Sequence, residues 1–150
     1  MRGRGEGGTV GGARAGLATG GRRSLRTERT LKDIALLVLV ALFVTAGVFH
    51  FLKPEPFERI VPAFLPWPRV LVYVSGVAEI VGGLALLAPQ LRTFAGIWLI
   101  ALLVAVFPAN LNMALGPERA GLGIAPVWLW LRLPGQLVLI AWVWWVALTD

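Results

Sequence analysis

Apolar residues gather into four blocks along the chain, separated by polar or proline-rich stretches. Each block approaches the length of about 20 residues that a helix needs to cross the hydrocarbon core of a bilayer. The predicted spans are 34–52, 70–88, 93–109 and 127–148. Four such helices and their loops use nearly all of the chain after residue 30. The pattern therefore predicts an all-α membrane protein, a four-helix transmembrane bundle without a soluble catalytic domain.

The stretch between the first two blocks differs from both an ordinary loop and a spanning helix. Prolines interrupt it at Pro54, Pro56, Pro62, Pro66 and Pro68, and large apolar residues lie between them. A short helix lying in the membrane interface accommodates both features. We therefore predict an interfacial helix around 57–61, after the first span.

The first 30 residues have a different composition from the rest. They hold seven arginines, nine glycines and almost no large apolar residues. Because such a segment buries too little surface to offset its ordering entropy, we predict a disordered tail at 1–30 and a transmembrane domain at 31–150. Its arginines suit anionic lipid headgroups, and no nucleic-acid partner is expected.

Two alternatives concern the beginning of the chain. One is an over-extended start site. The other is a signal peptide, with cleavage after the sequence Val44-Thr45-Ala46. The apolar run continues beyond that point through Phe49, which favours a retained membrane anchor.

Composition narrows the chemistry that the chain can perform. The chain is 57% hydrophobic with a mean hydropathy of +0.77, above the roughly 45–50% apolar share of soluble domains. It has no cysteine and one histidine. Disulfides, thiol catalysis, thiolate metal sites and a bis-histidine haem within one chain are thereby excluded. We expect no metal site. No cofactor is evident, and a quinone is the candidate that stays open.

Basic residues predict the orientation of the helices. Nine of the lysines and arginines fall on the side of the N-terminus and of the turn near Arg92, and five fall on the opposite side. Cytoplasmic segments carry the excess of basic residues. Both termini are therefore predicted to face the cytoplasm, in a multi-pass protein of the cytoplasmic membrane.

Glu79 is the only charged residue of the second predicted span. The helical rise places it about 13 Å along that span, close to the midplane. An ionisable group at this depth is a functional candidate, here a proton relay. In the alternative interpretation, burial keeps the carboxyl protonated, and a hydrogen bond to Ser75 or Gln136 fixes the helix register. Glycines at 76, 82 and 83 predict close approach of a neighbouring helix.

The other strongly polar residues fall in the outer half of the spans. With an up-down-up-down topology they converge on one outward-opening pocket, whose candidate binding residues are His50, Tyr73, Ser75, Asn110, Arg132 and Gln136. Each has a structural alternative. His50 could be an interfacial polar tip, Asn110 could cap the third helix, and Arg132 could extend to the headgroups.

Four segments, 46–67, 71–89, 99–115 and 128–145, together resemble the DoxX-like family of bacterial four-helix membrane proteins. The most specific strings are His50-Phe51 with Pro54, Ser75-Gly76 with Glu79, and Pro108-Ala109-Asn110 with Met113. The resemblance implies a membrane location, four helices and association with membrane redox enzymes such as thiosulfate:quinone oxidoreductase. Animal relatives of that family are thought to assemble receptor channels.

Two functions from different classes follow from these residues. The first is a quinone-reactive or redox-partner membrane subunit. In it, donors such as His50 or Gln136 contact the quinone carbonyls, Glu79 relays a proton, and a partner redox protein supplies electrons. The second is a non-catalytic membrane scaffold or assembly factor, in which the polar cluster fixes packing. A small-solute or proton carrier is a third option, which in four short spans would require a homo-oligomer.

Overall fold

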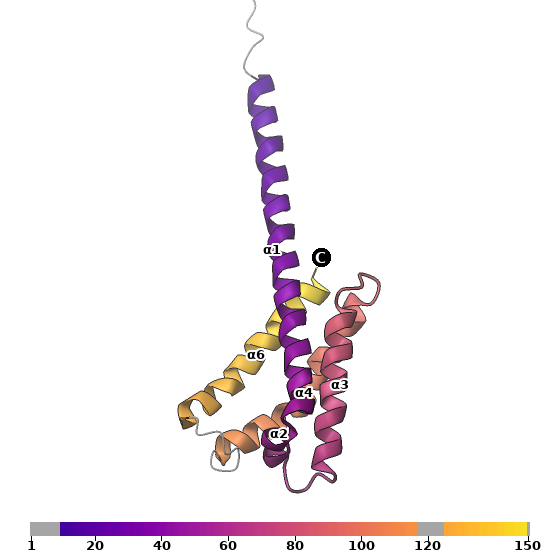
Figure 1. Ribbon diagram of the computed structural model, residues 1–150. Helices are drawn as coiled ribbons and strands as arrows, with labels where there is room; N and C mark the ends of the chain where they lie inside the picture. The colour runs from indigo at the N-terminus through magenta and orange to yellow at the C-terminus, as the bar shows by residue number, and fades with distance from the viewer. Residues whose placement is uncertain (1–9, 117–124, 150) are drawn as a thin grey trace, which may run out of the picture. The chain divides into compact units, whose positions relative to one another are not determined.

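The computed structural model describes residues 10–116 and 125–149 (Figure 1). In this part of the chain all regular structure is helical. The helices are α1 (Val10–Leu52), α2 (Pro54–Ile60), α3 (Pro68–Ala85), α4 (Arg92–Leu115) and α6 (Pro126–Leu148). The chain divides into two compact units, the first ending at Ala35 and the second beginning at Leu36.

The first unit contains the beginning of α1. Residues 10–30 are helical, although their composition predicts a disordered tail, and residues 1–9 lie outside the described part of the chain. The arginine, alanine and leucine residues of this segment favour a helix, its glycines oppose one, and the hydrogen bonds of a helix are local. The side chains of residues 26–30 are exposed. The boundary between 30 and 31 stays a prediction.

Four helices, α1, α3, α4 and α6, are long and apolar enough to cross a membrane. The predicted four-helix transmembrane bundle is thereby confirmed. The observed helices differ from the predicted spans at several ends. Helix α3 begins at Pro68, because proline is tolerated in the first turn, where its missing N–H has no partner in the helix.

The predicted end of the third span at Ala109 is wrong. Helix α4 passes through Pro108 and ends at Leu115. Proline removes one backbone hydrogen bond from a helix but leaves the others in place, and neighbouring helices in a membrane stabilise the interrupted turn. Asn110 consequently lies inside α4 and does not cap it.

Helix α2 is the predicted short interfacial segment, and it begins three residues earlier than expected, at Pro54. Two polar contacts hold it to neighbouring helices. Arg69 Nε donates to Glu58 Oε1 at 2.6 Å, and Asn112 Nδ2 donates to the carbonyl of Ile60 at 2.9 Å. Buried Ile60 also packs with Met113 and Leu129, so that α2 is tied to α3, α4 and α6.

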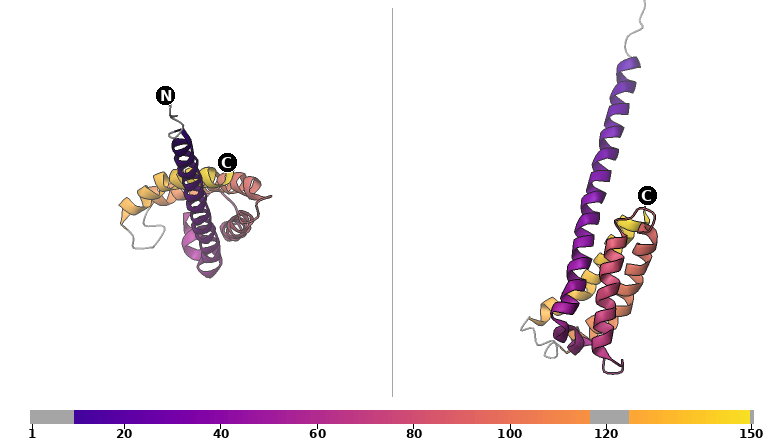
Figure 2. Two further views of the ribbon diagram at one scale, coloured as in Figure 1. Left: turned by 90° about the horizontal axis from the view of Figure 1, so that it is seen from above. Right: turned by 45° about the vertical axis from the view of Figure 1, so that its right-hand side comes forward.

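The second unit is built from two antiparallel helix pairs. The last part of α1 runs beside α3, and α4 runs beside α6 (Figure 1). Seen along the helices, α3 and the end of α1 lie on the same side of the α4–α6 pair (Figure 2). The bundle core consists of large aliphatic side chains, of which the most completely buried are Leu39, Leu86, Leu99, Met113 and Val143.

Glycines permit the closest contacts between these helices. A Cβ built on Gly47 would lie 2.6 Å from the carbonyl oxygen of Gly76, and one built on Gly76 would lie 2.8 Å from His50 Cβ. Gly83 contacts α1 in the same way, and Gly82 contacts α4 at Leu99. The close approach predicted for the glycines of the second span is therefore confirmed. The pairing of α1 with α3 places His50 next to Glu79.

Candidate functional site

A cavity of about 780 Å³ lies inside the second unit, lined by residues of α1, α2, α3, α4 and α6. Most of its lining side chains are apolar. The polar ones are His50, Ser75, Glu79, Asn110, Arg132 and Gln136. Six of the seven candidate residues from the sequence thus line one cavity, in the part of the bundle that is closed by α2.

Tyr73 is the candidate that lies elsewhere. Its ring stacks on Phe51, with ring centroids 5.3 Å apart and an interplanar angle of 4°, and Tyr73 is not among the residues that line the cavity. Tyr73 precedes Ser75 by two residues, a rotation of about 200° around a helix. The two side chains therefore point to different sides of α3, and the grouping of Tyr73 with the pocket is wrong.

Glu79 projects from the middle of α3 into the cavity. Its Oε2 is buried and accepts no hydrogen bond from any described residue, and His50 Nδ1 lies 3.7 Å from it. The structure joins Glu79 to neither Ser75 nor Gln136 by a hydrogen bond. Ser75 donates to the Val72 carbonyl at 2.9 Å, and Gln136 donates to the Leu103 carbonyl of α4. The expected layer of Ser75, Glu79 and Gln136 is therefore wrong.

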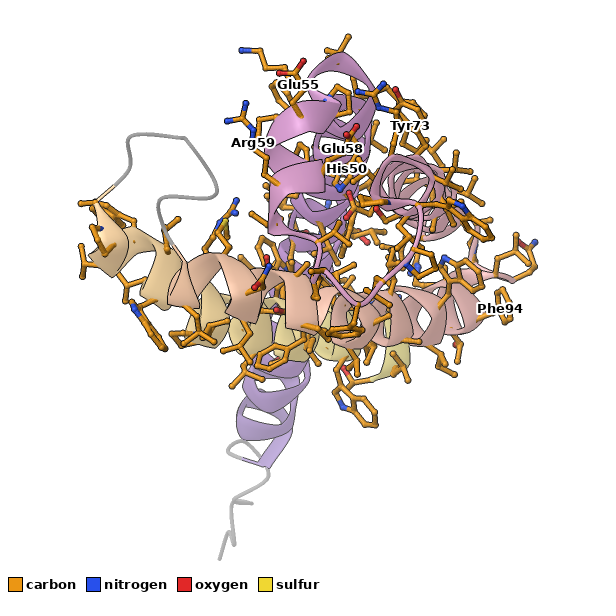
Figure 3. All side chains as sticks on the ribbon, turned by 90° about the horizontal axis from the view of Figure 1, so that it is seen from below. His50, Glu55, Glu58, Arg59, Tyr73 and Phe94 are labelled. Atoms are coloured by element: carbon orange, nitrogen blue, oxygen red, sulfur yellow. The ribbon has the colours of Figure 1, made fainter. Side chains whose placement is uncertain are left out.

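His50 is buried, with 8% of its surface exposed, and is no interfacial polar tip. Its Nδ1 lies 2.8 Å from the Ala46 carbonyl oxygen. Because a carbonyl can only accept, Nδ1 carries a hydrogen. The ring stacks on Phe57 of α2, with centroids 4.0 Å apart and an interplanar angle of 22°. In Figure 3 His50 lies inside the bundle, whereas Glu55 and Arg59 of α2 point away from it.

Asn110 and Gln136 connect α4 to α6. Asn110 Nδ2 donates to Gln136 Oε1 at 2.9 Å, and Gln136 Nε2 donates to the carbonyl of Leu103. Gln136 is 5% exposed. A buried amide costs free energy unless its donors and acceptors are paired, and these two bonds pair it. Both residues therefore contribute to helix packing as well as to the cavity wall.

We expect the Asn110–Gln136 bond to contribute measurably to stability. In a double-mutant cycle of Asn110→Ala and Gln136→Ala, the coupling free energy should be about 0.6–1.7 kcal/mol, the range found for hydrogen bonds between membrane helices. Reversible unfolding in mixed micelles measures it. Asn110→Ala combined with Trp98→Phe is the control, because Trp98 lies about 18 Å away along α4 and contacts α3. That pair should be additive, and additivity in both cycles would contradict a bond between Asn110 and Gln136.

Arg132 lies on the exposed side of α6, near the rim of the cavity. Its Nη1 contacts Met113 Sδ at 3.5 Å. In the described residues, Arg69 lies within 4 Å of a carboxylate, that of Glu58, and Arg132 forms no such pair. A direct pair between Arg132 and Glu79 is therefore absent.

Phe57 is the part of the site that the sequence analysis missed. It was assigned to an interfacial helix, and its sequence neighbourhood gives no sign that its ring would stack on a buried histidine. The contact between His50 and Glu79 was missed for a similar reason, since the two residues lie in different spans. Gly47 and Gly76 were the available signal, because small residues on two helices indicate where those helices approach.

Together these features define a multi-pass α-helical membrane protein with a partly open, mostly apolar cavity, in which Glu79 Oε2 accepts no hydrogen bond from the described residues. The model of the family described as a domain of unknown function (DUF8561) matches residues 39–147, and the chain belongs to that family. The match covers the cavity-lining segments of all the helices. No curated protein and no solved structure matches the chain.

Proposed function

We propose that this chain binds a small ring compound of quinone type in its cavity and serves as a membrane subunit of a redox system. The observation that carries the proposal is the cavity itself. A volume of about 780 Å³ falls within the range of small-molecule sites, which are mostly apolar with a few polar groups. A quinone head is a flat apolar ring with two carbonyl oxygens, and it suits such walls.

The polar residues supply groups for the accompanying proton transfer. Reduction of a quinone to a quinol adds two electrons and two protons, and each carbonyl becomes a hydroxyl. In this proposal a partner redox protein exchanges the electrons. Glu79 relays the proton that accompanies each of the two electrons through Oε2, and His50, at 3.7 Å from that oxygen, is a neighbouring titratable group. A carboxyl at membrane depth is costly unless it serves such a purpose.

The resemblance to DoxX-like proteins supports the same proposal. It rests on the strings around His50, Glu79 and Asn110, and all three of these residues line the cavity. That family is associated with a quinone-reducing enzyme. The proposal therefore extends to membership of a redox complex, with the lipid bilayer and a redox protein as partners.

A non-catalytic scaffold or assembly factor is the second candidate. The bonds of Gln136 to Asn110 and to the Leu103 carbonyl favour it, because they give two of the polar residues a packing role. This candidate gives no role to the unpaired Oε2 of Glu79 or to the cavity. Those two features make it the weaker of the two.

The binding test uses the full chain in lipid nanodiscs and a decyl-tailed quinone as the probe, with quenching of tryptophan fluorescence as the readout. Wild type should show saturable quenching. Gly135→Phe is the matched variant, because Gly135 lines the cavity and a Cβ there meets nothing within 4 Å. A phenylalanine at this position has room to occupy part of the cavity and should weaken binding about tenfold, as lost apolar contacts do. Equal quenching of both proteins would show only partition into lipid and would defeat the proposal.

We also propose that the chain lies in the cytoplasmic membrane with both termini in the cytoplasm. The excess of basic residues near the N-terminus and at Arg92 supports this orientation. A reporter that is active only in the cytoplasm should be active when fused after Asp150 and inactive when inserted into the loop at 115–125. A reporter active only outside the cytoplasm should give the reverse result, and its activity at the C-terminus would refute the orientation.

A further inference from the structure

The cavity presents two walls with different hydrogen-bonding properties. One wall, the α1–α3 wall, carries His50, Ser75 and Glu79, and the opposite wall, the α4–α6 wall, carries Asn110, Gln136 and Arg132. What a ligand meets at each wall depends on which donors and acceptors the protein has already used. The hydrogen bonds of these six side chains therefore indicate the chemistry of the ligand.

On the α1–α3 wall, the Ser75 hydroxyl and the His50 Nδ1–H already donate hydrogen bonds to backbone carbonyls of the protein. The Ser75 hydroxyl donates to the Val72 carbonyl, and His50 Nδ1–H donates to the Ala46 carbonyl. A carboxyl group has one donor hydrogen at most, and the buried Glu79 Oε2 receives no hydrogen bond from the described residues. When the Glu79 carboxyl is ionised and the His50 ring is neutral, this wall offers a ligand only acceptors, namely the lone pairs of Glu79, Ser75 and His50 Nε2.

On the α4–α6 wall the two amides bond to each other and to the Leu103 carbonyl. The guanidinium of Arg132 has five N–H groups, and the contact with Met113 Sδ engages one of its nitrogens. Each amide group has a second N–H that these two bonds leave unused. The α4–α6 wall therefore keeps donors for a ligand. The cavity thus accepts hydrogen bonds at the α1–α3 wall, called the deep wall below because His50 and Glu79 are nearly buried there, and donates them at the α4–α6 wall.

An aromatic surface adjoins the deep wall. Phe57 stacks on His50, and both rings belong to the cavity lining. Apolar side chains make up most of the remaining surface. A flat ring can pack against these walls while a substituent reaches Glu79.

From this arrangement we propose that the deep wall formed by His50, Ser75 and Glu79 binds a hydroxyl group, so that the preferred ligand is a hydroxyl-bearing aromatic compound, a phenol or a quinol, and not the corresponding quinone. The inference rests on the proposed function, because it specifies which form of a quinone-type ring the cavity takes. The carbonyl oxygens of a quinone can only accept hydrogen bonds. When Glu79 is ionised, a quinone therefore leaves Glu79 Oε2 without a hydrogen bond. A phenolic hydroxyl donates to that oxygen, and hydrogen bonds that satisfy a buried acceptor are the ones with a large net effect.

The test uses ligands without redox chemistry and the full chain in nanodiscs. Para-pentylphenol and para-pentylanisole have the same ring and tail, but the anisole has no donor. Each displaces the decyl-tailed quinone, and the inhibition constants are compared after correction for partition into empty nanodiscs. The phenol should bind about tenfold more tightly than the anisole, the ratio expected for one hydrogen bond to a buried acceptor.

Two variants assign this preference to Glu79. Glu79→Gln keeps an oxygen acceptor and should retain the preference for the phenol, whereas Glu79→Leu should reduce the ratio to about one. Thermal unfolding establishes that each variant is folded, and if Glu79→Leu fails to fold, the wild-type ratio and the Glu79→Gln ratio still decide the question. A linear alkanol of equal apolar area is the third ligand, because a hydroxyl-bearing lipid could use the same wall.

Each result has a defined meaning. If phenol and anisole displace the quinone equally well, the cavity is a quinone-type site without the hydroxyl preference, and this inference is overturned while the proposed function stands. If neither the quinone nor the phenol quenches the tryptophan fluorescence saturably, the proposed function and this inference both fail. An alkanol that binds as tightly as the phenol would overturn the aromatic part of the inference.

Discussion

Gly47→Ala is expected to destabilise the bundle by about 1–3 kcal/mol, the cost of forcing an extra methyl group into a closely packed contact. The new Cβ would lie 2.6 Å from the carbonyl oxygen of Gly76 and 2.7 Å from Ile80 Cγ1. A backbone carbonyl cannot rotate away as a flexible side chain can, so α1 and α3 must separate. Separation would also move His50 from Glu79. Unfolding in mixed micelles measures the loss.

Gly135→Ala is the matched control for this prediction. Both glycines lie inside helices, so both substitutions gain the same helix propensity, up to about 1 kcal/mol. A Cβ at Gly135 meets no atom within 4 Å. The control should therefore be neutral or stabilising. If the two variants have equal stability, α1 and α3 are not in contact at Gly47.

The second large effect is expected at Glu79. Glu79→Gln has nearly the shape of the native side chain and keeps a hydrogen-bond acceptor, but it cannot release a proton. If Glu79 relays protons, this variant should fold with unchanged melting temperature and lose function about a hundredfold or more, the usual effect of removing a proton-transfer group. The measurement is complementation of a deletion strain at matched membrane abundance.

Glu55→Gln is the control for the Glu79 experiment. Glu55→Gln is the same substitution at a different position, since Glu55 lies on α2 with its side chain exposed and pointing away from the bundle (Figure 3). It should complement fully. Full complementation by Glu79→Gln as well would defeat the proton relay and leave the scaffold as the better account of the chain.

The bundle could be predicted from the sequence because hydrophobicity over about 20 residues is a strong signal that depends on no tertiary contact. Helix ends were less predictable. Pro108 carries a local signal for termination, but α4 continues because the packing around it outweighs one lost hydrogen bond. Ser75 shows the same limitation at the site. Its spacing from Glu79 permits a contact, yet its hydroxyl bonds to a carbonyl of its own helix.

The candidate site was predictable as a set of residues and not as a network of bonds. Depth along a span can be counted, and it correctly grouped His50, Glu79 and Gln136 around one cavity. The direction in which a side chain points around the helix axis decides which residues it contacts, and depth along the span does not give that direction. Tyr73 is at the expected depth but faces Phe51, and the neighbour of Glu79 is a histidine from another helix. These pairings depend on how α1 and α3 rotate against each other.

The position of α2 has a consequence for how a ligand would arrive. Its contacts with Arg69 and Asn112 hold it over one end of the cavity. Cavity-lining side chains of α3 and α6, among them Val74, Trp128 and Leu131, are also exposed on the outer surface of the bundle. For the function proposed above, this exposure gives a ligand a sideways route of entry from the bilayer. Occupancy would then depend on the mole fraction of ligand dissolved in the lipid, so that at a fixed total concentration of ligand, adding empty membrane should empty the cavity.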